Sequence, residues 1–193
     1  MIRVVRIAGL VLVLTVIVAT HAQAGGPWKA QIVDAETGQP LEGVIVVAIW
    51  KTERTGIRMH AARDFFDVDE VVTGPDGRMV IPERSLMSWR RFSQVFGPEL
   101  IVFKPGYGVW DFREVTRQRG RPDAVSEREA LEREWKRFGR EEVVITLVPL
   151  RTQEERRRFA HSLDCCPAPE DRIPRFTLAL DVERRSFEYQ RQR

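Results

Sequence analysis

The sequence contains little histidine and little cysteine, and this limits its chemistry. Its three histidines are His21, His60 and His161, and its two cysteines are the neighbours Cys165 and Cys166. No H-E-x-x-H or H-x-x-E motif occurs, which excludes a zinc peptidase of the common kinds. His161, Cys165 and Cys166 have a spacing that could bring three ligands together, but a structural zinc site takes four. They are weak metal candidates, and we expect no metal and no cofactor.

The adjacent cysteines are compatible with three chemical states. The preferred Cα separation across a disulfide is about 5.5 Å, whereas neighbouring residues are about 3.8 Å apart. A vicinal disulfide between Cys165 and Cys166 would therefore be strained. The two thiols could instead form an intermolecular bridge or stay buried and free, and we favour no functional role for the pair.

Other catalytic patterns are missing as well. No G-x-S-x-G motif occurs, so the sequence indicates no serine nucleophile. The acidic residues Asp34, Glu36, Asp67, Asp69 and Glu70 do not have the spacing of an EF-hand calcium loop. Acids that alternate along a strand usually lie on its solvent-exposed face, and we expect that here. We predict no catalytic residue.

The chain has no strong excess of either charge. Its 31 lysines and arginines are nearly balanced by 28 acidic residues, which leaves a formal net charge of +3. Without Arg3 and Arg6 the net charge is about +1. A surface that binds nucleic acid would have a larger and more clustered basic excess, so we exclude a nucleic-acid partner.

The N-terminal segment has the features of a secretory signal peptide. Arg3 and Arg6 precede the apolar residues 7–18, and Ala22 to Ala24 match the small-x-small cleavage pattern. The apolar run is shorter than the ~20 residues that span a bilayer. We predict cleavage after Ala24 and a periplasmic or secreted protein with no membrane contact afterwards. The alternative is an inner-membrane anchor formed by an uncleaved signal.

Residues 31–50 form the predicted centre of the fold. Two apolar runs flank a block of turn-forming residues, and the second run, Val44–Trp50, is unbroken and rich in β-branched side chains. It therefore predicts a strand that is buried on both faces. An antiparallel sandwich normally buries one face of each sheet, so we expect an added helix to cover the outer face.

Further strands and helices are predicted from periodicity. Residues 66–82 have the pattern of a hairpin, and residues 99–112 and 141–150 are expected to be strands. Residues 85–96 are predicted to form a short helix, and residues 51–64 a long loop. Ser126 and Glu129 form a capping box before a helix that extends to about residue 140, with Leu131, Trp135 and Phe138 on one face. We expect the ligand-facing surface at loops 51–65 and 83–98.

The C-terminal residues 151–193 are predicted to be mostly helical. Thr152 and Glu155 form a second capping box, and Phe176, Leu180 and Phe187 recur at helical spacing. Residues 176–182 also alternate as a strand would. The final helix is expected either to pack on the sandwich or to form an arm for a partner.

Five tryptophans could form the core or a stacking platform for sugars. They are Trp28, Trp50, Trp89, Trp110 and Trp135. Several lie on apolar stripes, so we favour the core.

Three motifs together resemble the carboxypeptidase regulatory-like family. They are V-D-A-E-T-G-Q-P-L-E-G-V at 33–44, V-T-G-P-D-G-R at 72–78 and F-K-P-G-Y at 103–107. The resemblance implies a transthyretin-like β-sandwich of antiparallel strands, to which the helices are added. Its residues in this chain are structural turns and include no catalytic group: Gly38, Pro40, Gly43, Asp76, Gly77, Pro105 and Gly106. Transthyretin-related hydrolases have a histidine and arginine set and a C-terminal tyrosine motif, which this chain lacks.

The predicted organisation is a signal peptide at 1–24, a sandwich at 25–150 with a helical insertion at 113–140, and a helical extension at 151–193. We expect a non-catalytic, exported module that binds or scaffolds in the cell envelope, where the partner is an envelope protein or a carbohydrate. Two different functions stay open. One is a small periplasmic hydrolase with a site around His60 and residues 67–70, and the second is an adaptor that uses its C-terminal helices.

Overall fold

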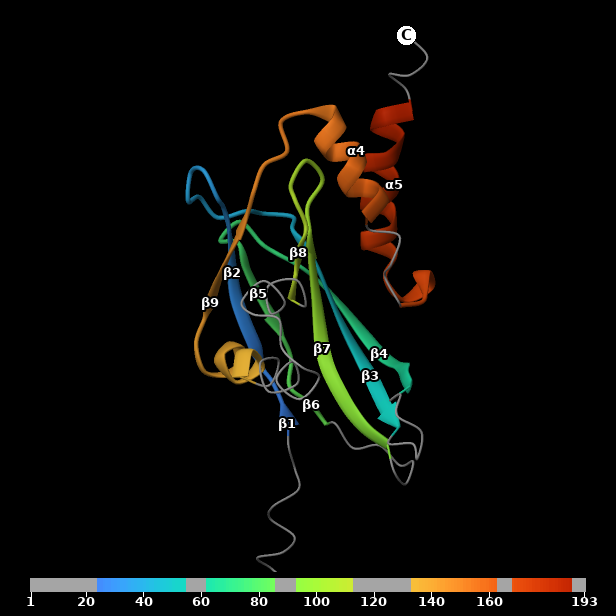
Figure 1. The fold of residues 1–193 in the computed structure, drawn as a ribbon. Helices are drawn as coiled ribbons and strands as arrows, with labels where there is room; N and C mark the ends of the chain where they lie inside the picture. Colours follow the sequence, from blue (N-terminus) through green and yellow to red (C-terminus); the bar gives the residue numbers. More distant parts are fainter. Residues whose placement is uncertain (1–23, 55–61, 86–92, 113–132, 163–167, 189–193) are drawn as a thin grey trace, which may run out of the picture.

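The protein is mainly β, with helices added to two facing sheets (Figure 1). The computed structural model describes residues 24–54, 62–85, 93–112, 133–162 and 168–188. The elements are β1 (Ala24–Gly25), β2 (Trp28–Asp34), β3 (Ile45–Arg54), β4 (Ala62–Val72), β5 (Arg78–Ile81), β6 (Arg84–Ser85), β7 (Ser93–Phe103), β8 (Trp110–Asp111), β9 (Val143–Leu147), α4 (Gln153–Ser162), η1 (Glu170–Arg172) and α5 (Pro174–Glu188).

The two main sheets have the orders β5-β2-β9 and β4-β3-β7-β8. All pairings in the second sheet are antiparallel, as is that of β2 with β5. Strand β9, however, runs parallel to β2, so the predicted antiparallel sandwich contains one parallel pair. The short strands β1 and β6 form a separate ladder in which Ala24 is opposite Ser85.

The central strand β3 is buried on both faces, as its sequence predicts. Val46, Ala48 and Trp50 belong to the core between the two sheets. Val47 and Ile49 point to the other side and belong to a second apolar cluster. All five side chains are completely inaccessible to solvent.

Helix α5 covers the outer face of the β3 sheet, which confirms the expected covering helix. Phe176 and Leu180 join Val47 and Ile49 in the outer cluster. The Phe176 ring meets Phe103 of β7 edge-on, with 5.6 Å between ring centroids. Figure 1 shows α5 beside β3 and β7, on the side away from β2 and β9. The tail therefore contributes to the core.

Helix α4 begins at the predicted capping box and is tied to α5. Thr152 Oγ1 accepts a hydrogen bond from Glu155 N at 3.2 Å, and Glu155 Oε2 accepts one from Thr152 N at 3.0 Å. Arg156 then forms a bidentate ion pair with Glu183 of α5, at 2.7 and 2.5 Å, and Glu183 is buried.

Two sequence-based predictions are wrong. Residues 93–96, predicted to be helical, are part of β7, where Ser93 is opposite Arg54. Residues 51–54 and 62–64, predicted to be loop, extend the β3–β4 hairpin. The periodic aromatic residues of 85–96 resemble a helix face, but pairing with β3 is the stronger constraint. Residues 86–92 and 55–61 lie outside the described ranges.

The apolar residues of the 133–140 helix enter the inner core. Phe138 is buried there, and Trp135 packs against the same cluster while its indole Nε1 donates to Pro98 O at 2.9 Å. Trp28 and Trp50 are also core residues, and Trp110 packs at the edge of the core. The core interpretation of these tryptophans is confirmed, whereas Trp89 lies outside the described residues.

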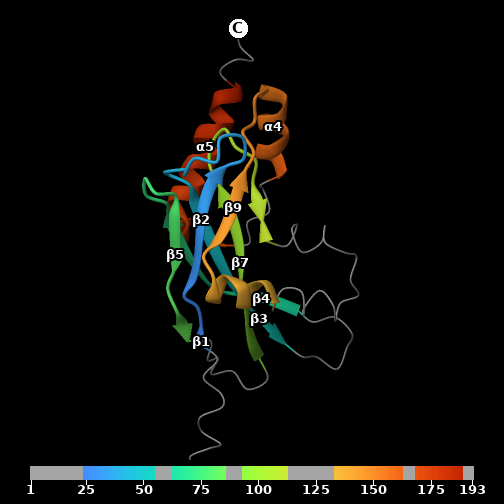
Figure 2. The ribbon, with the colours of Figure 1, turned by 90° about the vertical axis from the view of Figure 1, so that its left-hand side faces the viewer.

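The outer face of β5-β2-β9 is exposed to solvent. Figure 2 looks onto these three strands, and α5 lies behind them. Val80 and Val144 point outward with 51% and 59% of their surface exposed. Lys29 and Arg78 share this face, so it is mixed in polarity.

Candidate functional site

The acidic residues of β4 meet an arginine at the edge of the sandwich. Asp67 is opposite Trp50 of β3, and Asp69 is opposite Ala48. Residues directly opposite each other share a face of the sheet, so both carboxylates lie on the inner side. The expectation that these acids form the solvent-exposed face is wrong, since their side chains are only 29% and 24% exposed.

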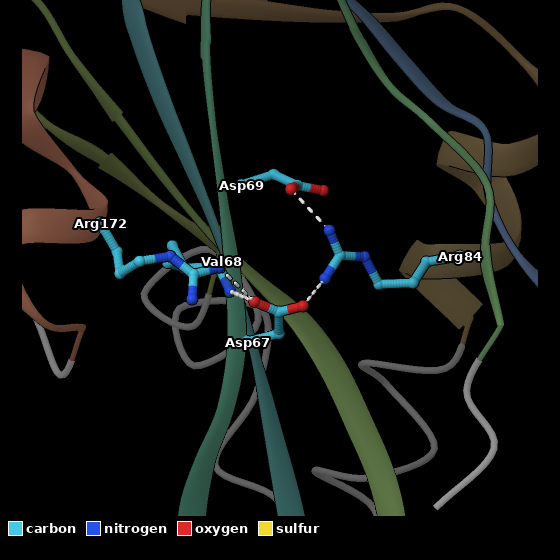
Figure 3. A network of polar contacts seen from close by, with 5 residues as sticks. All are labelled: Asp67, Val68, Asp69, Arg84 and Arg172. Atoms are coloured by element: carbon cyan, nitrogen blue, oxygen red, sulfur yellow. Dashed lines mark hydrogen bonds and ion pairs between the residues drawn. The ribbon is translucent and has the colours of Figure 1, made fainter.

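Arg84 of β6 reaches both carboxylates with its guanidinium fork (Figure 3). Its Nη1 donates to Asp67 Oδ2, and its Nη2 donates to Asp69 Oδ1 at 2.6 Å. The same guanidinium lies 4.5 Å from the ring centroid of Trp50. A cation over an indole face and between two carboxylates is stabilised by all three groups.

Asp67 also binds a residue of the C-terminal segment. Its Oδ1 accepts from Arg172 Nη2 of η1 at 2.8 Å and from the backbone N of Val68 at 2.9 Å (Figure 3). One carboxylate thus connects β4 with both Arg84 and the segment before α5.

Glu70 on the other face of β4 caps helix α5. Its carboxylate oxygens accept from the backbone N of Arg175 at 3.1 Å and of Phe176 at 2.6 Å. These N–H groups lie in the first turn, where they have no partner within the helix. The acidic residues of β4 therefore bind β6 on the inner side of the sheet and the start of α5 on its outer side.

Two buried polar atoms of this site have no hydrogen-bond partner among the described residues. They are Asp69 Oδ2 and the indole Nε1 of Trp50. One is an acceptor and one is a donor, and buried groups of this kind are normally satisfied.

A second polar cluster lies at the opposite end of the sandwich. Asp34 Oδ1 accepts from the backbone N of Glu36 and of Thr37 at 2.8 and 2.9 Å, and Oδ2 accepts from Tyr107 Oη at 2.9 Å. The two backbone hydrogen bonds, with the smaller contribution of Tyr107, hold the pKa of Asp34 below its usual value. Burial and the nearby Asp34 raise the pKa of Tyr107.

The three family-like motifs converge at this end. Asp34 of the first binds Tyr107 of the third. Thr73 of the second donates to Leu41 O at 2.7 Å and accepts from Val44 N at 2.9 Å. The predicted turn residues lie in or beside turns that join these segments: Gly38, Pro40, Gly43, Asp76, Gly77, Pro105 and Gly106.

A third polar pair is buried within the β3 sheet. Lys51 Nζ donates to Glu99 Oε2 at 2.7 Å, and the two side chains are 10% and 7% exposed. Because Lys51 was predicted to lie in a loop, this pair was not among the sequence-based predictions. A buried ion pair is costly to break, because removal of one partner leaves an uncompensated charge.

Of the predicted metal candidates, His161 lies in α4, while Cys165 and Cys166 lie outside the described ranges. His60, the residue of the alternative hydrolase site, also lies outside them. Within those ranges, no group of three or more His, Cys, Asp or Glu side chains could hold a metal ion. Over the same ranges, no helix has the length and apolarity needed to cross a membrane.

The contact of Arg84 with Asp67 and Asp69 was not among the sequence-based predictions. A signal was present, because Asp67 and Asp69 alternate in one arm of a predicted hairpin and Arg84 follows the other arm after two residues. The contact depends on how β6, which pairs with β1, lies against β4, and a single sequence does not specify this. No protein-family model, curated protein or solved structure matches this chain significantly.

Proposed function

We propose that this chain is an exported, non-catalytic β-sandwich module that binds or scaffolds a component of the cell envelope. The observation that supports this most strongly is the pairing at β4. Asp67 and Asp69 are held by Arg84, and Glu70 caps α5. A carboxylate committed to such contacts holds strands and helices in place and is poorly suited to transfer protons.

The proposal includes kinship with the carboxypeptidase regulatory-like modules. Its support is the convergence of the three motifs, in which Asp34 binds Tyr107 and Thr73 binds the segment at Leu41. Residues that maintain adjoining turns account for these motifs without a catalytic role.

The hydrolase and adaptor functions have less support. A hydrolase site around His60 would need a free carboxylate from residues 67–70, and these acids are already paired with Arg84, Arg172 or the start of α5. An adaptor with a detachable tail would lose the contacts of Phe176 and Leu180 with β3.

Site-specific photo-crosslinking in intact cells tests the proposal. We would place a photoreactive residue separately at Val80, Val144 and Leu178, which are exposed at 51%, 59% and 65%. At least one position should give a discrete adduct with an envelope component in the fractionated envelope. A photoreactive residue at the buried Ile32 is the matched control.

Two outcomes would contradict the proposal. One is a chain that stays in the cytoplasmic fraction and gives no adduct from any exposed position. The other is hydrolysis of an ester, peptide or glycoside substrate by the purified chain, if Asp67→Asn abolishes that activity without lowering the melting temperature.

A further inference from the structure

Helix α5 presents a narrow apolar seam on its outer surface. Leu178 is 65% exposed and Val182 is 55% exposed. Arg175 precedes them by one turn, and Arg185 follows by one turn; both are exposed. The spacing of three, four and three residues places these four side chains on one face of the helix. We call these four residues the α5 seam.

The face of α5 opposite the seam packs against the β3 sheet and α4. Phe176 and Leu180 are buried against the β3 sheet, and Glu183 is buried against Arg156 of α4. The start of the helix is capped by Glu70. The α5 seam therefore belongs to a helix that is anchored along its opposite face and at its start, and little order has to be gained when it binds a partner.

The arginines of the seam differ from other arginines in the tail. Among the described residues, no carboxylate pairs with the guanidinium of Arg175 or Arg185, whereas Arg156 and Arg172 each have an acidic partner. Asp181 is half-buried and borders the seam, three residues after Leu178 and four residues before Arg185. Both ends of the seam thus carry positive charge.

This charge pattern disfavours some of the possible binding partners of the α5 seam. In a two-fold antiparallel pairing of two α5 helices, Arg175 would approach Arg185 of the second copy, and a parallel pairing would juxtapose identical arginines. Self-association is therefore opposed by like charges. A membrane surface suits a wider apolar face than Leu178 and Val182 provide.

We propose that the α5 seam binds an amphipathic helix of a partner protein that has apolar side chains at its centre and acidic residues at both ends. The seam extends over about 15 Å, which corresponds to about three helical turns. Leu178 and Val182 supply apolar contacts, and Arg175 and Arg185 pair with the acidic ends. This inference rests on the proposed binding function and names the partner's chemistry.

A designed peptide provides the probe. It is a 21-residue helix with leucine at the central seam positions and glutamate at both ends, and the comparison peptide has lysine in place of glutamate. Binding to the secreted chain is measured by fluorescence anisotropy. We expect the glutamate peptide to bind at least about tenfold more tightly, with a difference that shrinks as salt is raised.

Substitutions in the α5 seam test whether the peptide binds there. Leu178→Ala should weaken binding by about tenfold, because exposed apolar surface that the partner would bury is removed. Joint replacement of Arg175 and Arg185 by Gln should remove the preference for glutamate over lysine. Val144→Ala, on the exposed face of the other sheet, is the matched control and should leave binding unchanged.

Several results would overturn the inference. These are equal binding of the two peptides, glutamate-peptide binding that is unaffected by Leu178→Ala, and binding of phosphatidylglycerol vesicles but of neither peptide. Dimerisation in sedimentation that Leu178→Ala abolishes would also overturn it. If crosslinks in cells form only from Val80 or Val144, the inference fails while the proposed envelope-binding function stands.

Discussion

At the scale of single residues, Gly77 has the most restrictive environment in the converging turns. Its φ is +69°, and a Cβ built there would lie 2.5 Å from Ile32 O. Gly106 has a φ of +83°, but a Cβ there would meet nothing within 4 Å. Alanine substitutions at the two glycines therefore separate the free-energy cost of the backbone conformation from that of the steric clash.

We expect Gly77→Ala to destabilise the protein by about 2–5 kcal/mol, because the backbone cost and the overpacking add. Gly106→Ala should cost only about 1–2 kcal/mol, from the backbone alone. Urea unfolding of both variants is the measurement. Equal losses of unfolding free energy in the two variants would show that the turn at Gly77 relaxes around the new methyl group.

The acid dependence of stability should include a contribution from Asp34. Backbone hydrogen bonds lower its pKa in the folded protein, so the folded state favours the carboxylate. This contribution is complete above the unfolded pKa of about 3.9 and is lost as the pH falls through the lower folded value. The stability difference between the wild type and Asp34→Ala should therefore narrow below about pH 4. Urea midpoints between pH 3 and pH 7 measure it, and a constant difference would contradict the assignment.

At the scale of elements, one strand side chain stabilises the start of a helix distant in sequence. Glu70 of β4 accepts from two backbone N–H groups in the first turn of α5. Loss of a capping group costs about 0.5–2 kcal/mol. We expect Glu70→Ala to lower the unfolding free energy within that range, and Glu70→Gln to lower it less.

Glu142→Ala is the control for this prediction. Glu142 pairs with Arg78 at the surface, with the two side chains 41% and 57% exposed, so its loss should cost less than about 0.5 kcal/mol. Equal effects of Glu70→Ala and Glu142→Ala, measured by thermal unfolding, would refute the capping role.

The tail should be required for a stable sandwich. Truncation after Leu150 removes Ile173, Phe176 and Leu180, which are buried beside Val47 and Ile49. Each large apolar side chain that loses its cover costs about 1.5–3 kcal/mol, so the truncated chain should aggregate or melt far lower. Light scattering and thermal unfolding measure this. A monomeric truncated chain of unchanged stability would restore the adaptor interpretation.

The elements show where sequence analysis succeeds and where it does not. Apolar side chains on both sides of Val44–Trp50 are a local pattern, and they predicted both the buried strand and its covering helix. The approach of Arg84 to Asp67 and Asp69 depends on how β6 lies against β4, which is a non-local property. Residues 93–96 have a helix-like aromatic spacing, but β7 pairs there with β3, and tertiary pairing overrides local preference.

At the scale of the whole molecule, export remains a prediction. A cut after Ala24 would leave Gly25 opposite Arg84 and, among the residues that the structure describes, would remove the pairing of Ala24 with Ser85. The sandwich should therefore tolerate removal of the signal peptide. Intact-mass measurement of envelope material should give a chain that begins at Gly25, and a mass that retains residues 1–24 would refute cleavage at this site.

The parallel pair of β2 and β9 has a consequence for the order of synthesis. Strand β2 is made early and β9 late, yet each residue from Ala30 to Asp34 is opposite a residue of β9. The sheet β5-β2-β9 therefore stays incomplete until Leu147 has emerged from the ribosome. Contacts between distant parts of a chain slow folding, because the loop-closure entropy is lost before they form. The sheet β5-β2-β9 therefore closes late, after most of the chain has been made.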